Sequence, residues 1–312
     1  MSESKKGIHH ISIISGDGQT NAEFYVKTLG LRMVLKTVNQ DDPSNYHLFY
    51  ANGAGQPGSS ITFFPWPRAV KGEAGTGQTT VIAFGVPEKS LEFWTNRLAD
   101  QHVEYKEPFE RFGYKVLQFE DPDGLTLEFV FDSSMDSVSG WESEYVSEEY
   151  SIRGFWSATL RLSEMTPTAE LLEKVLGFSK KESAGNLTLF ESNSEIGRYL
   201  IIEETGEHQP TKNGRGIVHH IAFRAKNEEE LRKMRDEVID FGLSPTDVID
   251  RHVFKSVYFQ SPGGVLFEMA SDDPGYKSVV DDESEMGKKL FLPPWLERKR
   301  EEIESRLPEI TV

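Results

Sequence analysis

The chain has 312 residues, of which 37% are hydrophobic and 27% charged, as in a globular protein long enough for two ordinary domains. It contains no cysteine, which excludes disulfides, thiolate zinc sites, iron–sulfur clusters and a cysteine nucleophile. The net charge of −17 opposes binding to nucleic acid or to an anionic membrane, so we expect neither as a partner.

The cellular location of the protein is predicted from features that the sequence lacks. No apolar stretch approaches the length of a membrane span, and the opening residues 1–6 do not have the pattern of a signal peptide. Together with the absence of cysteine, this predicts a cytoplasmic location.

The first predicted elements fall in residues 7–67. An apolar run follows His9-His10, and a helix is expected from about Asn21 to the glycine of Leu29-Gly30-Leu31, because a glycine just past the last apolar helical position is typical of a helix C-cap. Three β-rich runs follow the helix, at residues 32–38, 46–50 and 60–64.

Residues 78–132 repeat this plan. The run Val81-Ile-Ala-Phe84 precedes a helical stretch in which Leu91, Trp94 and Leu98 recur at helical spacing. The segment ends in the turn Asp121-Pro-Asp-Gly124, followed by an apolar strand that carries Glu128.

Two further segments, at residues 153–205 and 215–272, have the same plan. The third has a helix predicted from about Pro167 to Gly177. The fourth begins with His219-His220-Ile-Ala-Phe223 and ends in the turn Ser261-Pro-Gly-Gly264 and a strand that carries Glu268. Its helix places three apolar side chains at helical spacing: Leu231, Met234 and Val238.

We therefore predict an α+β fold of four βαβββ modules, paired into two curled mixed sheets, or half-barrels, with helices outside. The expected division is an N-terminal domain at 1–132, a linker at 133–152, a C-terminal domain at 153–272 and a tail at 273–312. In the tail, Leu296, Ile303 and Leu307 form one face of a predicted short helix.

The repeated turns and the strands that end in glutamate resemble the vicinal oxygen chelate superfamily, which includes glyoxalase I, extradiol dioxygenases and bleomycin-resistance proteins. The resemblance covers about residues 7–272. It is more specific to hydroquinone-type ring-cleaving dioxygenases, on the following stretches: Gly7-Ile-His-His-Ile11, Tyr46-His-Leu-Phe-Tyr50, Pro57-Gly58, Thr62-Phe-Phe-Pro65, Gly216-Ile-Val-His-His-Ile221, Tyr258 and Ser261-Pro-Gly-Gly-Val-Leu-Phe-Glu268.

The repeats also serve as an internal control for a metal site. Val81 occupies the place of His220 in the second module, where Glu128 has no histidine partner, and we predict a structural or solvent-facing Glu128. Joining the first and fourth modules instead gives His10, His220 and Glu268. Two imidazoles and one carboxylate that leave positions open are typical of non-haem Fe(II) enzymes that bind O₂ and substrate together. The resemblance implies the same three ligands.

The resemblance also implies catalytic neighbours. His9 is expected near the substrate, and Tyr258 and Arg251 near a substrate oxygen, where a phenol and a guanidinium stabilise developing negative charge. A loop salt bridge with Asp250 is the alternative for Arg251. His47 and His252 are candidates for hydrogen bonds to the metal ligands.

The leading functional hypothesis is an extradiol-type, Fe(II)-dependent dioxygenase, with Mn(II) as a second metal, that cleaves a hydroquinone- or catechol-type ring and inserts both atoms of O₂. Its partners would be a small aromatic diol and O₂, and the architecture is compatible with a homodimer. One alternative is a glyoxalase-type isomerase or lyase that uses Zn(II) or Ni(II) and needs a fourth ligand. The other is a non-enzymatic binder of a toxic aromatic compound or an antibiotic.

Overall fold

The computed structural model describes residues 4–53 and 55–312. The expectation about a signal peptide partly concerns residues 1–3, which lie outside the described residues. Across the described part of the chain, every helix is too short or too polar to traverse a bilayer.

The four predicted modules are present, each with one helical segment and four strands. The first contains β1 (Ile8–Ser15), α1 (Gly18–Ala22), a π-helical turn (Glu23–Thr28), β2 (Arg32–Val38), β3 (Tyr46–Ala51) and β4 (Ser60–Pro65). The second contains β5 (Gln78–Val86), α2 (Leu91–Asp100), β6 (Phe109–Arg111), β7 (Tyr114–Glu120) and β8 (Thr126–Phe131). The third contains β9 (Gly154–Leu162), α3 (Thr166–Lys174), β10 (Ser179–Ala184), β11 (Leu187–Glu191) and β12 (Tyr199–Glu204). The fourth contains β13 (Ile217–Ala225), α4 (Glu228–Asp240), β14 (Ile249–Asp250), β15 (Lys255–Gln260) and β16 (Leu266–Ser271).

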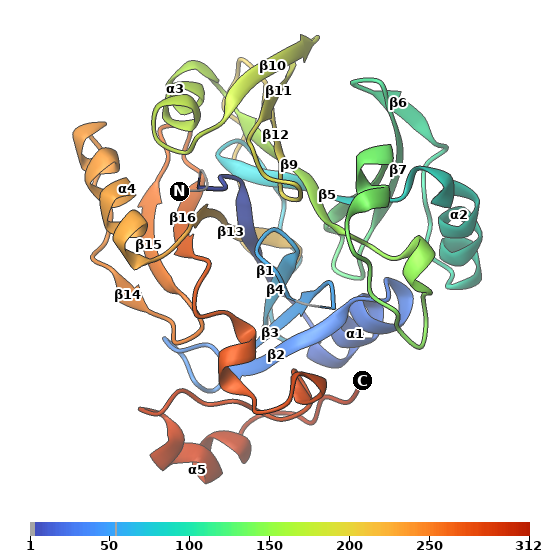
Figure 1. Ribbon diagram of the computed structural model, residues 1–312, viewed down its shortest axis with the longest axis vertical. Helices are drawn as coiled ribbons and strands as arrows, with labels where there is room; N and C mark the ends of the chain where they lie inside the picture. Colours follow the sequence, from blue (N-terminus) through green and yellow to red (C-terminus); the bar gives the residue numbers. More distant parts are fainter. Residues whose placement is uncertain (1–3, 54) are drawn as a thin grey trace.

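The modules pair across the sequence into two eight-stranded sheets. One sheet has the order β14-β15-β16-β13-β1-β4-β3-β2 and joins the fourth module to the first; the other has the order β10-β11-β12-β9-β5-β8-β7-β6 and joins the third to the second (Figure 1). In every module the first strand is parallel to the last, and the other pairs are antiparallel. The predicted fold class is confirmed.

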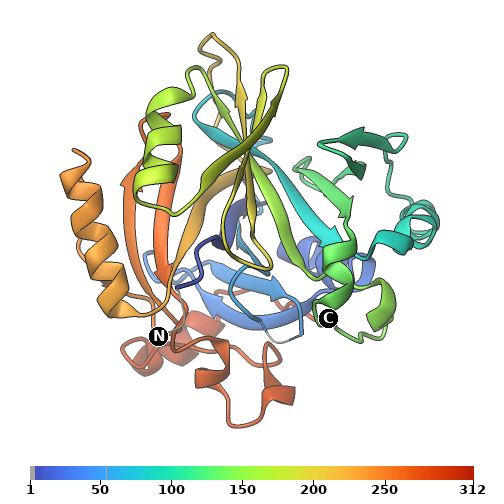
Figure 2. The same cartoon turned by 45° about the horizontal axis from the view of Figure 1, so that its top comes forward.

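Each sheet is centred on an antiparallel pair of first strands, β1 with β13 and β5 with β9. The two sheets lie side by side (Figure 2), and backbone hydrogen bonds such as Ile8 N–H to the Gly197 carbonyl, 2.8 Å, join them. Strands from both sequence halves contribute to each sheet. The division into an N-terminal and a C-terminal domain at residues 133–152 is therefore based on the sequence repeats alone and remains a proposal.

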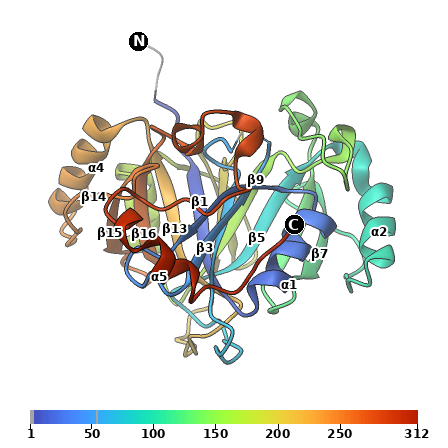
Figure 3. The ribbon, with the colours of Figure 1, turned by 90° about the horizontal axis from the view of Figure 1, so that it is seen from below.

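The helices lie outside the strands, with α4 and α2 on opposite flanks (Figure 3). The predicted apolar faces are the buried ones, with Trp94 and Leu98 in α2 and Met234 and Val238 in α4. After the first helical segment, Gly30 has φ of 72°, a left-handed conformation that favours glycine and ends the helix.

The tail lies along the β2 edge of the first sheet (Figure 1). The Phe291 N–H donates to the Lys36 carbonyl at 2.9 Å, and the Tyr276 hydroxyl lies 2.9 Å from Ser60 Oγ. The predicted tail helix is present as α5 (Arg300–Glu304), where buried Ile303 packs in a cluster with Val38. The tail thus covers an edge strand that would otherwise expose unpaired backbone groups.

Candidate metal centre

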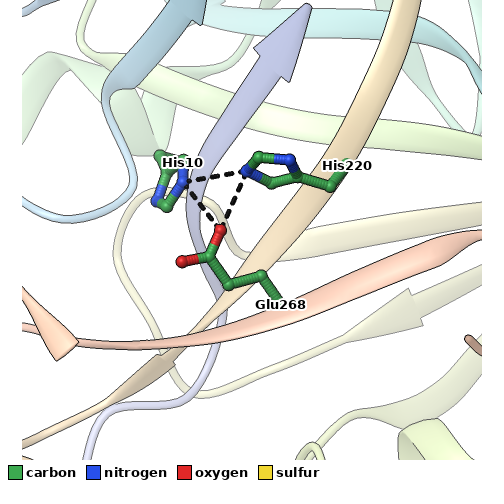
Figure 4. A group of neighbouring side chains, drawn as sticks. All are labelled: His10, His220 and Glu268. Atoms are coloured by element: carbon green, nitrogen blue, oxygen red, sulfur yellow. Dashed lines mark hydrogen bonds and ion pairs between the residues drawn. The ribbon is translucent and has the colours of Figure 1, made fainter. Parts of the chain in front are cut away.

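Three side chains from different strands converge at the centre of the first sheet. His10 is on β1, His220 on β13 and Glu268 on β16, and the Cα register pairs Ala222 with both His10 and Glu268 (Figure 4). Because residues that pair across neighbouring strands share a face, this register brings the first and fourth modules to one point. All three side chains are buried.

The distances within this group fit a single cation. Glu268 Oε2 lies 3.1 Å from His10 Nε2 and 2.8 Å from His220 Nε2, and the two Nε2 atoms are 3.4 Å apart. Neighbouring ligands bound at roughly 2.1 Å from a metal lie about 3 Å from each other. Glu268 Oε2 is buried and makes no hydrogen bond of acceptable geometry within the described residues. The donor set therefore fits a metal ion, and among residues 4–53 and 55–312 it is the one such group of three or more.

The pKa shifts in this group favour a carboxylate at Glu268 and a neutral imidazole at His220. Burial opposes ionisation of Glu268, but the two neighbouring histidines hold its pKa well below the usual range. Burial lowers the pKa of His220, and the neighbouring Glu268 only partly offsets this shift. A deprotonated carboxylate and an unprotonated Nε2 are the forms that bind a cation. The Ser256 hydroxyl donates to Glu268 Oε1, which leaves Oε2 directed at the histidines.

The two doubled histidines have the same geometry. His9 Nδ1 lies 2.8 Å from His10 Nδ1, and His219 Nδ1 lies 2.8 Å from His220 Nδ1. If Nε2 of the second histidine faces a cation without a proton, its Nδ1 carries the proton and donates it to the first histidine. Burial lowers the pKa of His9 well below its ordinary value. Burial also lowers the pKa of His219, although this residue is exposed. Both imidazoles are therefore neutral and can accept the hydrogen bond.

The second sheet contains the equivalent positions without the histidines. There Ala83 pairs with Ser157 and Glu128, as Ala222 pairs with His10 and Glu268. Val81 therefore stands at the position of His220, as the sequence predicted, and Ser157 at that of His10.

Glu128 is buried, so its predicted structural role fits and the solvent-facing alternative is wrong. Arg111 donates to Glu128 Oε1 at 3.1 Å and to Oε2, and Gln118 Nε2 donates to Oε1 at 2.8 Å. Arg111 and Gln118 precede Glu128 by the same numbers of residues as Arg251 and Tyr258 precede Glu268. Arg111 thus pairs with the buried carboxylate in the second sheet, where the described residues form no group of three metal ligands.

A cavity that is partly open to solvent adjoins the His10–His220–Glu268 group. His10, His220, Arg251 and Tyr258 all line it. Burial raises the pKa of Tyr258 well above its ordinary value, so its hydroxyl stays protonated as a donor. The Arg251 guanidinium lies 5.5 Å from the Tyr258 ring centre, and its Nη2 is 3.4 Å from Asp41 Oδ2 rather than bonded to Asp250.

The apolar part of the cavity wall comes from three strands, the loop between β14 and β15, and the tail. Its members are Leu35, Phe49, Phe64, Val253, Phe254 and Phe291. A cavity with apolar walls and a few converging polar groups suits a small aromatic molecule.

The other predicted neighbours have different positions. Among the described residues that line the cavity, His9 is not included, whereas His47 is. His47 Nε2 bonds to Thr62 Oγ1 at 2.8 Å, not to a member of the triad. His252 packs against Phe291 with the two rings tilted and their centres 5.1 Å apart. Neither His47 nor His252 hydrogen-bonds to His10, His220 or Glu268 within the described chain.

Sequence reasoning missed Ser256 and Thr37. Ser256 is two residues before Tyr258, but only the pairing of β15 with β16 places its hydroxyl on Glu268. Thr37 lines the cavity from β2, and its pairing with His47 across the hairpin to β3 could be anticipated only after the strand register was known.

Several known proteins resemble this chain. MhqO of Bacillus subtilis, provisionally assigned as a ring-cleaving dioxygenase, is 39% identical over 98% of this chain and 97% of its own length. The chlorohydroquinone/hydroquinone 1,2-dioxygenase of Sphingobium indicum is 33% identical over 97% of this chain and 96% of its own. The crystal structure of a Bacillus subtilis protein superimposes with a TM-score of 0.94 at 38% identity, covering 99% of both chains.

The model of one family matches most of the chain, at residues 7–129 and 157–269. These two matches include the sixteen strands of the described residues, except for the ends of β8, β9 and β16. They also include all three members of the candidate metal group. The chain therefore belongs to the glyoxalase/bleomycin resistance protein/dioxygenase superfamily.

Proposed function

We propose that this protein is an Fe(II)-dependent dioxygenase that cleaves a hydroquinone- or catechol-type ring next to a hydroxyl-bearing carbon, in the extradiol manner. The observation that carries the proposal is the set of two histidines and one glutamate beside an apolar cavity. Three protein ligands leave coordination positions for substrate and O₂ on one side. The names of MhqO and of the Sphingobium enzyme support ring cleavage.

In this proposal, His10, His220 and Glu268 hold the metal, which when bound supplies the path for electrons between the ring and O₂. Tyr258 donates its hydroxyl proton toward the substrate oxygen, and Arg251 adds positive charge beside it. His9 and His219 orient the two ligand imidazoles rather than contacting substrate.

The cavity contributes positioning and water exclusion. Its aromatic walls sandwich a flat ring, so the reacting carbon and O₂ are held together rather than meeting by diffusion. Both oxygen atoms of O₂ are retained in the ring-opened product, whose formula is that of the diol plus O₂. The reaction therefore needs no external reductant.

The test compares Glu268→Gln with Glu128→Gln. Each replaces a fully buried glutamate by its amide at equivalent positions of the two sheets. After loading with Fe(II) under argon, wild type and Glu128→Gln should bind iron and consume O₂ with methylhydroquinone. Glu268→Gln should bind no iron and should consume no O₂.

Two other outcomes would identify the competing functions. Iron-loaded wild type that consumes no O₂ with methylhydroquinone, hydroquinone or catechol contradicts ring cleavage. Turnover of a methylglyoxal–thiol hemithioacetal with Ni(II) or Zn(II) would indicate an isomerase, although within the described residues the group lacks a fourth ligand. Ligand binding that survives His10→Ala and His220→Ala would indicate a binding protein.

A further inference from the structure

Two polar side chains line the same cavity and have no part in the metal group. Thr37 on β2 and His47 on β3 are Cα partners across an antiparallel pair, so their side chains share the inward face of the hairpin. Thr37 is 5% exposed, and its Oγ1 has no hydrogen-bond partner among the described residues. A buried hydroxyl that has no protein partner and lines a cavity is available to hydrogen-bond a molecule bound there.

His47 is held rigidly in this wall. Its ring lies between Phe49 and Phe64, with ring centres 4.0 and 4.1 Å away. Its Nε2 lies 2.8 Å from Thr62 Oγ1, which in turn lies 2.7 Å from Ser12 Oγ. These contacts fix the orientation of the imidazole and occupy Nε2. Its Nδ1 therefore remains for a ligand, and no hydrogen bond to Nδ1 occurs in the described part of the chain.

The two residues lie on a different wall from the metal group. In the sheet order, β3 is two strands from β1 and β2 is three strands from it. Adjacent strands are roughly 4.8 Å apart, so the backbone of β3 lies about 10 Å from that of β1 along the sheet. Thr37 and His47 therefore line the cavity from strands that carry no member of the metal group.

We propose that Thr37 and His47 form a second polar subsite that binds the hydroxyl group para to the hydroxyl at the metal, and so select para-dihydroxybenzenes over catechols. The inference rests on the proposed function, because it places the first hydroxyl at the His10–His220–Glu268 group. A catechol has both oxygens on one edge of the ring and leaves this subsite unused. A hydroquinone presents its second oxygen on the opposite edge, where a neutral imidazole and a hydroxyl can each donate or accept a hydrogen bond.

The test measures binding without turnover. Fe(II)-loaded protein under argon is titrated calorimetrically with hydroquinone, with catechol and with phenol, which lacks the second hydroxyl. Wild type should bind hydroquinone roughly tenfold more tightly than phenol, as expected for one or two hydrogen bonds to buried groups. Thr37→Val and His47→Phe should each bring that ratio toward one, and Thr37→Ser should retain the wild-type ratio.

Thr79→Val is the matched control, because Thr79 is a buried strand threonine of the second sheet whose Oγ1 also lacks a partner in the described residues. It should leave the ratio at the wild-type value. An unchanged hydroquinone-to-phenol ratio in both Thr37→Val and His47→Phe would overturn the subsite, as would wild type that prefers catechol.

Oxygen uptake separates this inference from the proposed function. Wild type that shows the binding ratio but consumes no O₂ with any diol contradicts ring cleavage and supports the subsite. Wild type that cleaves hydroquinone and catechol with equal kcat/KM contradicts the subsite and supports ring cleavage.

Discussion

At each doubled histidine, one imidazole faces the candidate metal position and the other lies behind it. The Nδ1–Nδ1 separations of 2.8 Å are the same in both pairs, although the pairs are 210 residues apart in the chain. A hydrogen bond to the far nitrogen of a ligand histidine fixes its tautomer and raises its basicity. The repetition of "HHI" in the sequence thus corresponds to the two histidines of the candidate metal group, each with its own hydrogen-bond acceptor.

His219→Phe tests this role, because it removes the acceptor at an exposed position. We expect metal affinity to fall roughly 10- to 100-fold, the usual effect of removing such a partner. Competition with a chelator measures the affinity. The exposed His208 provides a control, since His208→Phe should leave the metal affinity unchanged. Equal affinities in all three proteins would contradict the assignment.

A second prediction at this scale concerns a carboxylate away from the cavity. Asp121 Oδ2 accepts from the Tyr25 hydroxyl at 3.0 Å, and Oδ1 accepts from the backbone N–H of Asp123 and of Leu125, each at 2.9 Å. Burial is the main cause that raises its pKa from 3.8 to about 6. A folded pKa above the unfolded one means that this group's contribution to stability is greatest below pH 4 and is lost as the pH rises through 6.

Asp121→Asn keeps the acceptor for the turn and removes the titration. The free energy of unfolding of the variant relative to wild type should therefore increase between pH 4 and pH 7, by at most about 3 kcal/mol. Urea titrations at several pH values measure it. Asp247→Asn, at a side chain that is 98% exposed, should give a flat difference across this range. A flat difference for Asp121→Asn as well would contradict the prediction.

At the scale of elements, the second and fourth modules show two ways to bury a glutamate on the last strand. In the fourth module two histidines surround Glu268, and in the second module Arg111 and Gln118 bind Glu128. An ion pair this deep contributes little net stability, but removal of one partner leaves an uncompensated buried charge.

Arg111→Leu should therefore lower the free energy of unfolding by about 3–5 kcal/mol, because it leaves the buried Glu128 carboxylate without its cationic partner. Urea unfolding of the variant and wild type measures the loss. The double variant Arg111→Leu with Glu128→Leu should recover most of it, because no charge is then left in the sheet. If the double variant is as unstable as Arg111→Leu, lost packing rather than an unpaired charge causes the destabilisation.

The element scale is also where the sequence was most informative. Apolar runs and Pro/Gly turns repeated four times predicted the modules, and β2 has the predicted bounds. The π-helical turn Glu23–Thr28 was not predicted, because helical periodicity does not distinguish it from an α-helix over so few residues. The triad was predictable because equivalent positions in the repeats could be compared. Thr37 and Ser256 were not, because cross-strand register decides what their hydroxyls contact.

For the whole molecule, the candidate metal centre joins the first module to the fourth. A ligand that binds only the folded chain stabilises it, by about 2.7 kcal/mol when its free concentration is 100 times its Kd. Fe(II) or Mn(II) should therefore raise the Tm of wild type and of Glu128→Gln under argon, and EDTA should reverse the shift. Glu268→Gln should show none. A shift of equal size in Glu268→Gln would place the metal elsewhere.

The pairing of β1 with β13 also has a consequence for synthesis. Strand β1 leaves the ribosome early, but its antiparallel partner begins at Ile217 and Glu268 follows later still. At 5–20 residues per second, His10 would wait roughly 10–50 s for the rest of its site. During that interval one side of β1 has no partner and the nascent chain cannot form the three-ligand group. Metal capture by this group therefore reports that the ribosome has translated the chain past its fourth module.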